Sequence, residues 1–135
     1  MLLGGGSSPS ARMIKYHAVR TGYCFQGYNF ATSPEVKNFQ VVPCSGDHEA
    51  EITLAYDYWA TAKEYPGDKA LNAQSYAECV KALSSYVGVA SGKSRLTSEY
   101  FRPDANTWKS GDRRLICVVH LESGLLNGSV RGTGQ

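Results

Sequence analysis

The sequence predicts an α+β fold in which an antiparallel sheet carries one principal helix packed on one face. Three observations lead to this prediction. Alternating and continuous apolar segments are typical of several strands, and a single long segment has apolar residues at helical spacing. Four widely spaced cysteines indicate disulfides that fasten these elements together. With 135 residues, 42% of them hydrophobic, the chain is long enough to bury a core.

Residues 1–12 are expected to form a flexible lead, and residues 13–135 a single folded domain. The lead is rich in Gly and Ser, and it lacks both the basic start and the long apolar segment of a signal peptide. No apolar run approaches the ~20 residues that a membrane-spanning helix needs. Any attachment to a membrane is therefore expected through a tether that is absent from this chain.

The net charge of the chain is only +2, and its 14 basic residues are scattered along the sequence. A protein that binds nucleic acid usually gathers its basic residues on one face. The composition therefore argues against DNA or RNA as a partner.

The first half of the domain is predicted to contain short strands at residues 14–19, 23–25 and 36–42, with a loop at residues 26–34. Aromatic residues crowd the loop and the strand before it: Tyr23, Phe25, Tyr28 and Phe30. We interpret them as a cover over one end of the core. An aromatic ligand-binding patch is the alternative interpretation.

A longer strand follows Cys44 and is expected to end near Trp59 and Ala60. Its residues alternate in character, which is typical of a strand that is buried on one face only. One face is predicted to hold Ile52, Leu54, Tyr56 and Tyr58, and the other face Glu51, Thr53, Ala55 and Asp57.

One principal helix is predicted over residues 69–87. Asp68 is expected to cap its first turn, and Gly88 is expected to end it. Apolar residues recur at helical spacing along one stripe, which is expected to face the sheet: Tyr76, Cys79, Val80, Leu83 and Val87.

The second half of the domain is predicted to add three strands and one helical turn. The strands are expected at residues 99–102, which Pro103 ends, at residues 115–121 and at residues 128–131. Residues 115–121 form a nearly continuous apolar run, which is typical of a central strand buried on both faces. Residues 104–109 are expected to form the helical turn.

The four cysteines include no Cys-x-x-Cys pair, which favours disulfides over a zinc or redox motif. Disulfides imply an oxidising compartment outside the cytoplasm. Four cysteines allow three pairings. We favour Cys24–Cys44 and Cys79–Cys117, because each closes a moderate loop between neighbouring elements. The second of these would fasten the helix to the sheet.

The densest group of chemically active side chains follows Cys44: Asp47, His48, Glu49 and Glu51. We interpret His48 and Glu51 as structural residues that tie down the turn after the disulfide. One alternative is a metal site, which would also need His17 or His120 to reach sufficient ligands. Another alternative is a docking surface for a cell-envelope partner.

A small secreted hydrolase is a further alternative. Glu49 or Glu51, with a partner such as Asp112, could act on glycans as a pair of carboxylates. The chain has none of the common hydrolase or phosphate-loop motifs, and the disulfides leave no thiol nucleophile. We therefore expect no catalytic residue, no bound metal and no cofactor.

Trp108, Asp112 and Arg113 form a second candidate site. A bidentate pair between Asp112 and Arg113 is expected to clamp the Trp108 turn onto the sheet. Binding of an anionic ligand through Arg113 or Arg114 is the alternative. Trp108 itself is expected to be a packing residue rather than a ligand platform.

Several short motifs follow one another between residues 22 and 132: Gly22-Tyr23-Cys24-Phe25, Val42-Pro43-Cys44, His48-Glu49-Ala50-Glu51, Tyr65-Pro66-Gly67, Phe101-Arg102-Pro103, Gly111-Asp112-Arg113, and Leu126-Asn127-Gly128-Ser129-Val130-Arg131-Gly132. In order and spacing they resemble the actinobacterial septum formation domain family. The resemblance implies an extracytoplasmic four-cysteine domain, tethered in its relatives by a membrane helix or a lipid, with no defining catalytic mechanism. Gly46-Asp47 departs from the proline that often precedes the histidine in that family.

The sequence therefore predicts a non-catalytic interaction or assembly module of the actinobacterial cell envelope, linked to septum formation or cell division. It is expected to work outside the cytoplasm, secreted or membrane-tethered, with a cell-envelope protein as its partner. The alternative is a small secreted hydrolase or metal-binding domain that uses His48, Glu49 and Glu51.

Overall fold

The structure, a computed structural model, describes residues 11–135 and contains a six-stranded antiparallel sheet with one long helix packed on it. This is the predicted α+β fold. The lead predicted at residues 1–12 lies outside the described residues, except for its last two. The second of these, Arg12, already belongs to the first strand.

The main sheet has the strand order β1-β3-β2-β5-β7-β6, and every neighbouring pair in it is antiparallel. Its strands are β1 (Arg12–Lys15), β2 (Cys24–Gln26), β3 (Asn38–Val42), β5 (Ala50–Tyr56), β6 (Thr97–Phe101) and β7 (Leu115–His120). A separate small ribbon pairs β4 (Asp47–His48) with β8 (Leu126–Asn127). The helices are α1 (Asp68–Val87) and α2 (Ala105–Lys109), and 3₁₀ turns cover Tyr16–Ala18 and Ser91–Lys93.

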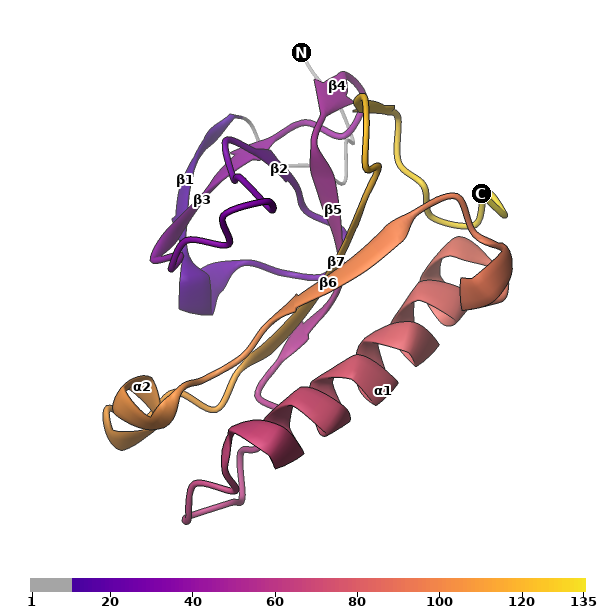
Figure 1. Cartoon of the computed structure of the whole chain (residues 1–135). Helices are drawn as coiled ribbons and strands as arrows, with labels where there is room; N and C mark the ends of the chain where they lie inside the picture. Colours follow the sequence, from indigo (N-terminus) through magenta and orange to yellow (C-terminus); the bar gives the residue numbers. More distant parts are fainter. Residues whose placement is uncertain (1–10) are drawn as a thin grey trace.

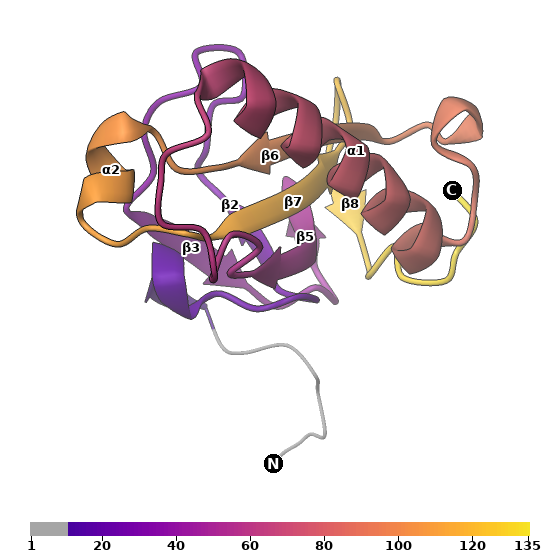
Figure 2. The ribbon, with the colours of Figure 1, turned by 90° about the horizontal axis from the view of Figure 1, so that it is seen from below.

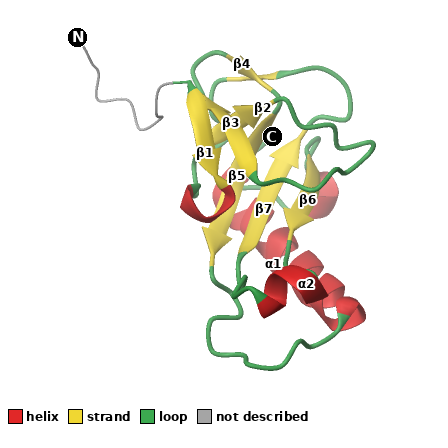
Figure 3. Ribbon diagram, turned by 90° about the vertical axis from the view of Figure 1, so that its left-hand side faces the viewer, coloured by secondary structure: helices red, strands yellow, loops and turns green. Residues whose placement is uncertain are grey.

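Strand β7 runs through the centre of the molecule, as its continuous apolar sequence predicts. All six of its residues are buried, because β5 and β6 flank it and the sheet is covered on both faces. The helix α1 packs across β5, β6 and β7 on one face (Figure 1, Figure 2). Figure 3 shows β1, β2 and β3 side by side at the other end of the sheet from β6.

The sheet curls so strongly that strands far apart in its order touch across the face opposite α1. The ring of Phe39 in β3 lies 5.3 Å from the ring of Phe101 in β6, although β2, β5 and β7 separate these strands. Buried apolar residues fill this concave face: Tyr16, Val19, Phe25, Phe39, Val41, Ala50, Ile52, Ile116 and Val118. The sheet is therefore an incomplete barrel whose gap lies between its two edge strands, β1 and β6.

Strand β5 departs from the predicted alternation in two ways. It ends at Tyr56, and Ala50 to Thr53 are all buried, because the concave core covers one face of β5 while α1 and the C-terminal segment cover the other. A β-bulge between Ile52 and Leu54 adds one residue relative to β7. One extra residue exchanges the two faces of a strand. Ile52 therefore belongs to the concave core and Leu54 packs on the α1 side, so the prediction of one shared face is wrong.

The helix α1 begins one residue before the prediction and ends where predicted. Gly88 has a φ of 91°, a left-handed conformation that glycine adopts without strain, and its amide donates to the carbonyl oxygen of Ser84 at 2.9 Å. The prediction that Asp68 caps the helix is wrong. Gly67 occupies the N-cap position, and the Asp68 carboxylate accepts a hydrogen bond from the hydroxyl of Tyr65.

The buried face of α1 differs from the predicted stripe. Tyr76 is 67% exposed and Val80 is only partly buried. The helix approaches the sheet along a line of residues spaced four apart, where the small side chains of Ser75 and Cys79 allow close contact. Its buried residues are Leu71, Ser75, Cys79, Leu83, Tyr86 and Val87.

Both predicted disulfides are present, and no cysteine of the chain is free. Cys24–Cys44 joins β2 to the turn before β4, with the two Cα atoms 5.3 Å apart. Cys79–Cys117 fastens α1 to β7, with the two Cα atoms 5.2 Å apart. All four cysteines are buried. The covalent links therefore lie inside the folded structure.

Two short strands differ from the prediction. Strand β1 ends at Lys15 instead of continuing through residues 14–19, because the buried side chain of Tyr16 enters the concave core from a 3₁₀ turn. The strand predicted at residues 128–131 is absent. Gly128 has a φ of 79°, which ends the extended conformation, and β8 pairs with β4 just before it.

The short helix α2 forms at the predicted place and begins with a capping box. The Asp104 carboxylate accepts a hydrogen bond from the amide of Thr107 at 2.8 Å. In return, the Thr107 hydroxyl accepts one from the amide of Asp104 at 3.0 Å. These bonds satisfy amides at the helix start that no helical carbonyl can reach.

The Asp104→Ala variant is expected to lower the free energy of unfolding by about 1 kcal/mol, because alanine leaves the first turn of α2 without its side-chain acceptor. Urea denaturation of the variant beside the unmodified protein measures the difference. Asn106→Ala, an exposed change in the same helix, is the matched control. A loss no larger than that of the control would contradict the role of the cap.

Candidate functional site

Glu51 lies at the centre of a buried polar cluster that joins three parts of the chain. It belongs to β5, and its side chain is fully buried. One carboxylate oxygen accepts hydrogen bonds from the hydroxyls of Tyr86 at 2.5 Å and Ser129 at 2.6 Å. The other oxygen accepts one from the amide of Val130 at 3.0 Å. Glu51 therefore fastens α1 and the C-terminal segment to the sheet.

His48 completes this cluster and is also fully buried. Its Nδ1 lies 2.8 Å from the carbonyl oxygen of Gly46, which can only accept, so Nδ1 carries a hydrogen. Its Nε2 lies 3.7 Å from a carboxylate oxygen of Glu51 and has no hydrogen-bond partner among the described residues. These contacts favour the structural interpretation of His48 over a docking surface, which would need an exposed ring.

Burial by itself would raise the pKa of Glu51, but its neighbours outweigh this effect. The nearby His48 ring and the hydrogen bonds from Ser129, Tyr86 and Val130 stabilise the carboxylate, so the pKa of Glu51 is lower than its ordinary value. Burial and the neighbouring carboxylate raise the pKa of the Tyr86 hydroxyl, which therefore keeps its hydrogen and remains a donor. Glu51 is a charged carboxylate with its partners in place, not an acid or base poised for proton transfer.

The other acidic residues near His48 form hydrogen bonds with different partners. Glu49 accepts a hydrogen bond from the amide of Gly27, and Asp47 accepts one from the side chain of Asn127 at 2.8 Å. Asp112, the partner that the hydrolase alternative gives to Glu49 or Glu51, pairs with His17 and accepts from the amide of Arg114.

The three histidines of the chain lie in separate places. His17 pairs with Asp112, with Nε2 and Oδ1 3.3 Å apart. His120 pairs with Glu99, with Nε2 and Oε2 3.0 Å apart. Neither ring joins His48, so the further histidine that the metal alternative requires beside His48 is missing from the described residues there.

The sulfur atoms of Cys24 and Cys44 lie within 4.8 Å of each other and of a carboxylate oxygen of Glu51. Metal binding by cysteine requires the thiolate. These two sulfurs are bonded to each other, so they do not supply thiolates beside Glu51.

Arg113 clamps the Trp108 turn, but not through the carboxylate of Asp112 as predicted. Its guanidinium carbon lies 3.7 Å from the centre of the Trp108 ring, and Trp108 is buried. Its nitrogens donate to the carbonyl oxygens of Ala62, Trp108 and Asp112 at 2.8–3.0 Å. The Asp112 carboxylate instead accepts from the amide of Arg114 at 3.0 Å. The guanidinium of Arg113 is thus engaged by the protein, which disfavours an anionic ligand there.

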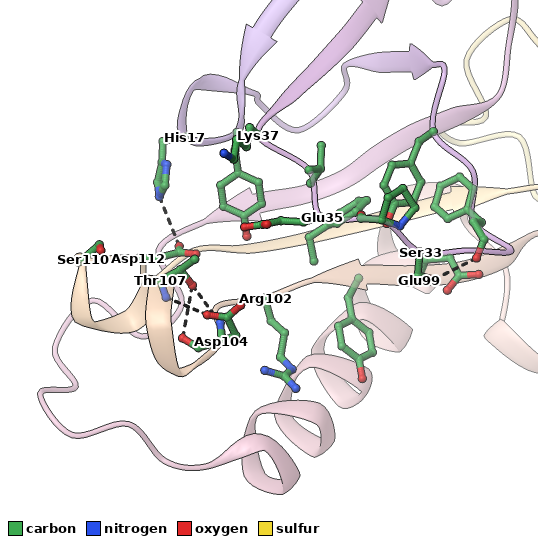
Figure 4. A pocket seen from close by; sticks show the side chains of 18 residues that line it. His17, Ser33, Glu35, Lys37, Glu99, Arg102, Asp104, Thr107, Ser110 and Asp112 are labelled. Carbon is green, nitrogen blue, oxygen red and sulfur yellow. Dashed lines mark hydrogen bonds and ion pairs between the residues drawn. The ribbon is translucent and has the colours of Figure 1, made fainter.

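A cavity of about 710 Å³ opens beside the gap between the two sheet edges, and its volume is within the range of ligand sites. We call it the trough. Its walls are the loop of residues 28–37, strand β6 and the segment around α2, with the 3₁₀ turn at one end (Figure 4). Aromatic side chains line it from several elements: Tyr16, Tyr28, Phe30, Tyr100 and Phe101.

Two aromatic residues hold the loop of residues 28–37 in place across the gap. The ring of Tyr28 lies edge-on to Phe101 at 5.1 Å, and its hydroxyl donates to the carbonyl oxygen of Pro34 at 2.7 Å. The ring of Phe30 stacks on His120, with centroids 4.0 Å apart. Both residues therefore pack against the core side and also line the trough.

Ionisable groups line the trough beside these rings: His17, Glu35, Lys37, Glu99, Arg102, Asp104 and Asp112. Some already have partners, as the His17–Asp112 and Glu99–His120 pairs show. The side chains of Glu35 and Lys37 are exposed and form no hydrogen bond or ion pair within residues 11–135. The trough therefore combines apolar surface with polar groups that a ligand can reach.

Most trough residues have no distinguishing signal in the sequence. Glu35, Lys37, Glu99 and Arg102 are isolated charges on three different segments, and only the fold brings them together. The sequence features that point to this region are the aromatic crowding between residues 23 and 30 and the candidate residue Asp112, but neither predicts a cavity.

The sequence model of one family, described as septum formation, matches residues 21–134. The chain belongs to the septum formation family. This confirms the family resemblance of the ordered motifs and supports a role related to cell division. Comparisons with curated proteins and with solved structures gave no match.

Two features of this septum formation domain bear on where it works. Its two disulfides indicate an oxidising, extracytoplasmic environment. Among the described residues, no helix combines the length and the apolar character that crossing a membrane requires.

The septum formation domain is expected to lose stability in acid because of Glu51. The pKa of this carboxyl is lower in the folded protein than in the unfolded chain. Its contribution to stability is therefore present above the ordinary pKa and is lost as the pH falls through the lowered value. Urea denaturation is expected to show a stable plateau near neutral pH and a decline below about pH 4.5. The Glu51→Gln variant should lack this part of the decline, and an unchanged pH profile in that variant would contradict the assignment.

Proposed function

We propose that this domain is a non-catalytic interaction module that works outside the cytoplasm during septum formation and binds a cell-envelope protein in the trough. The trough is the observation that carries the proposal. It combines aromatic surface with accessible charged groups in one concave site, which is the usual composition of a recognition surface.

The burial of Glu51 and His48 argues against a catalytic role for these two residues. Glu51 and His48 are fully buried, and neither lines the trough or the smaller cavity beside α1. A catalytic acid or base must come within hydrogen-bond reach of its substrate. Glu51 and His48 are enclosed and do not meet this requirement. Asp112 does line the trough, but its carboxylate already pairs with His17 and accepts from the amide of Arg114, and Glu49 accepts from the amide of Gly27.

The compartment is tested by mass measurement of the native protein after alkylation without a reductant. We expect no alkylated cysteine, because both disulfides form outside the reducing cytosol. Four alkylated thiols would overturn the extracytoplasmic assignment.

The trough is tested by exchanging its two free charges in the double variant Glu35→Lys and Lys37→Glu. Both side chains are exposed and unpaired within the described chain, so the stability is expected to change by less than about 0.5 kcal/mol. In the native host, with this variant as the only copy, we expect fewer septa and longer cells because partner binding is weakened.

The matched control is the double variant Glu122→Lys and Lys93→Glu, which makes the same exchange at exposed positions outside the trough. Microscopy of membrane-stained cells measures septum frequency and cell length in both strains. Normal septation in the trough variant, at unchanged protein level, would overturn the proposal. Equal defects in the two variants would also overturn it.

A further inference from the structure

Strand β6 is an edge of the main sheet, and its outer side is open. It pairs with β7 on one side, and within residues 11–135 no further strand pairs with it on the other. Its five residues are all partly exposed. Alternate amide and carbonyl groups of an edge strand point away from the sheet. The outer side of β6 therefore offers backbone donors and acceptors to another chain.

The trough runs along this open edge. Three consecutive residues of β6 line it, from Glu99 to Phe101, and so does Arg102, which follows the strand. Consecutive side chains of a strand point to opposite faces of the sheet, so a cavity that contacts all three lies beside the backbone of β6 rather than on one face. The loop of residues 28–37 forms the opposite wall, and among the described residues it makes no backbone hydrogen bond to β6 (Figure 4).

The two edges of the sheet differ in their protection against pairing. Strand β1 carries Arg12 and Lys15, and charged residues of this kind discourage the addition of another strand. Strand β6 contains no Lys, Arg or Pro, and its one charged residue, Glu99, is bonded to His120. The edge that borders the trough is thus the one suited to accept a further strand.

Glu99 and Phe101 determine which side chains would suit such a strand. Both lie on the concave side of the sheet, where Glu99 bonds to His120 and Phe101 packs on Tyr28. Directly opposed residues of neighbouring strands interact, and opposite charges or an aromatic with a β-branched residue are favourable pairs. A strand beside β6 would therefore place a basic residue next to Glu99 and a β-branched one next to Phe101, two positions apart.

The charge of the trough also favours a basic segment. Its lining has four carboxylates and two permanent cations: Glu35, Glu99, Asp104 and Asp112 against Lys37 and Arg102. The trough is thus acidic, whereas the whole chain has a net charge of +2. Complementary charge speeds encounter and excludes wrongly charged partners.

We propose that the trough binds an extended peptide segment of a partner protein, which adds to the open edge of β6 as a further strand and carries a basic residue two positions from a β-branched one. Main-chain hydrogen bonds supply affinity in this mode, and alternate side chains supply specificity. The inference rests on the proposed function, and it names the chemistry by which the trough recognises its partner.

The probe for this inference is the blocked peptide Thr-Val-Thr-Lys-Thr-Val-Thr. Its alternate residues present valine, lysine and valine to one face, and its order is the same in both directions, so it tests parallel and antiparallel addition alike. Titrated into the isotope-labelled protein, it is expected to shift the backbone amide resonances of residues 97–101 and 28–37. Amide exchange in β6 is expected to slow, and β1 is not expected to respond.

Methylated peptides separate strand addition from simple hydrophobic binding. Methylating one alternate set of peptide amides removes the donors that face β6 and is expected to weaken binding more than about tenfold. Methylating the other set is expected to have a smaller effect, because those amides face away.

Peptide charge tests the role of Glu99. A peptide with glutamate in place of lysine is expected to bind up to about fivefold more weakly, because like charges would lie opposite each other. The Glu99→Gln variant should reduce this preference, and the exposed control Glu122→Gln should retain it.

Three results would overturn strand addition: no shift in β6 at about 1 mM peptide, shifts centred on β1, or equal binding of the two methylated peptides. The edge of β6 would instead be occupied by a second copy of this chain if two results were found together. These are slow amide exchange in β6 before peptide is added and a dimer in sedimentation. If the peptide does not bind but the trough double variant impairs septation, only the inference of strand addition is wrong. If the peptide does not bind and the trough double variant septates normally, the proposed function is wrong as well.

Discussion

Replacing Glu51 with alanine is expected to lower the free energy of unfolding by roughly 3–5 kcal/mol. The change removes the acceptor of three hydrogen bonds and leaves the donors of Tyr86, Ser129 and Val130 unpaired in a buried site. It also removes the carboxylate beside His48. Because small domains have a total stability of roughly 5–15 kcal/mol, the loss is a large fraction. Urea denaturation near neutral pH measures it.

Glu49→Ala is the matched control for this prediction. Glu49 is a neighbouring carboxylate that is only partly buried and accepts from one backbone amide. Its replacement is expected to cost no more than about 1.5 kcal/mol. If the two variants lose equal stability, the burial and bonding of Glu51 have no special importance. Glu51→Gln should fall between them, because its amide keeps one acceptor oxygen but loses the charge.

Removing the Cys79–Cys117 disulfide is expected to have the second large effect. The two cysteines are 38 residues apart, for which the loss of chain entropy in the unfolded state corresponds to about 4 kcal/mol. The double change to alanine avoids leaving an unpaired thiol in the core. We expect the melting temperature to fall by roughly 10–20 °C. An unchanged melting temperature would contradict the view that this bond fastens α1 to the sheet.

The Cys24–Cys44 disulfide provides the comparison. Its cysteines are 20 residues apart, so the same reasoning gives a smaller loss of about 3 kcal/mol for the double change to alanine. If this variant is instead the less stable of the two, loop closure does not dominate. The proximity of its sulfurs to the buried Glu51 carboxylate would then be the physical reason to examine.

Elements with a strong local pattern could be predicted from the sequence. The continuous apolar run of β7, the helical spacing of α1 with its terminal Gly88, and the short helix after Asp104 all appear within one or two residues of the expected place. Each depends on neighbours in the chain, which the sequence shows directly. The disulfide pairing was also predicted correctly, because joining neighbouring elements gave the shorter loops.

Elements governed by distant contacts could not be predicted in this way. The bulge at Thr53 changes which face Leu54 occupies, and it depends on the register of β5 against β7. The exposure of Tyr76 depends on the rotation at which α1 meets the sheet. The alternation around Glu51 indicated a solvent-facing side chain, whereas the C-terminal segment folds over it.

By itself, the sequence determined the α+β class, the two disulfides, the family and the compartment that the disulfides indicate. Only the tertiary structure decided that Glu51 and His48 are enclosed, and that the trough beside β6 exists. The physical reason is that burial and concavity arise where segments far apart in the chain meet. A pattern of neighbouring residues records the periodicity of one element, but not which other element will cover it.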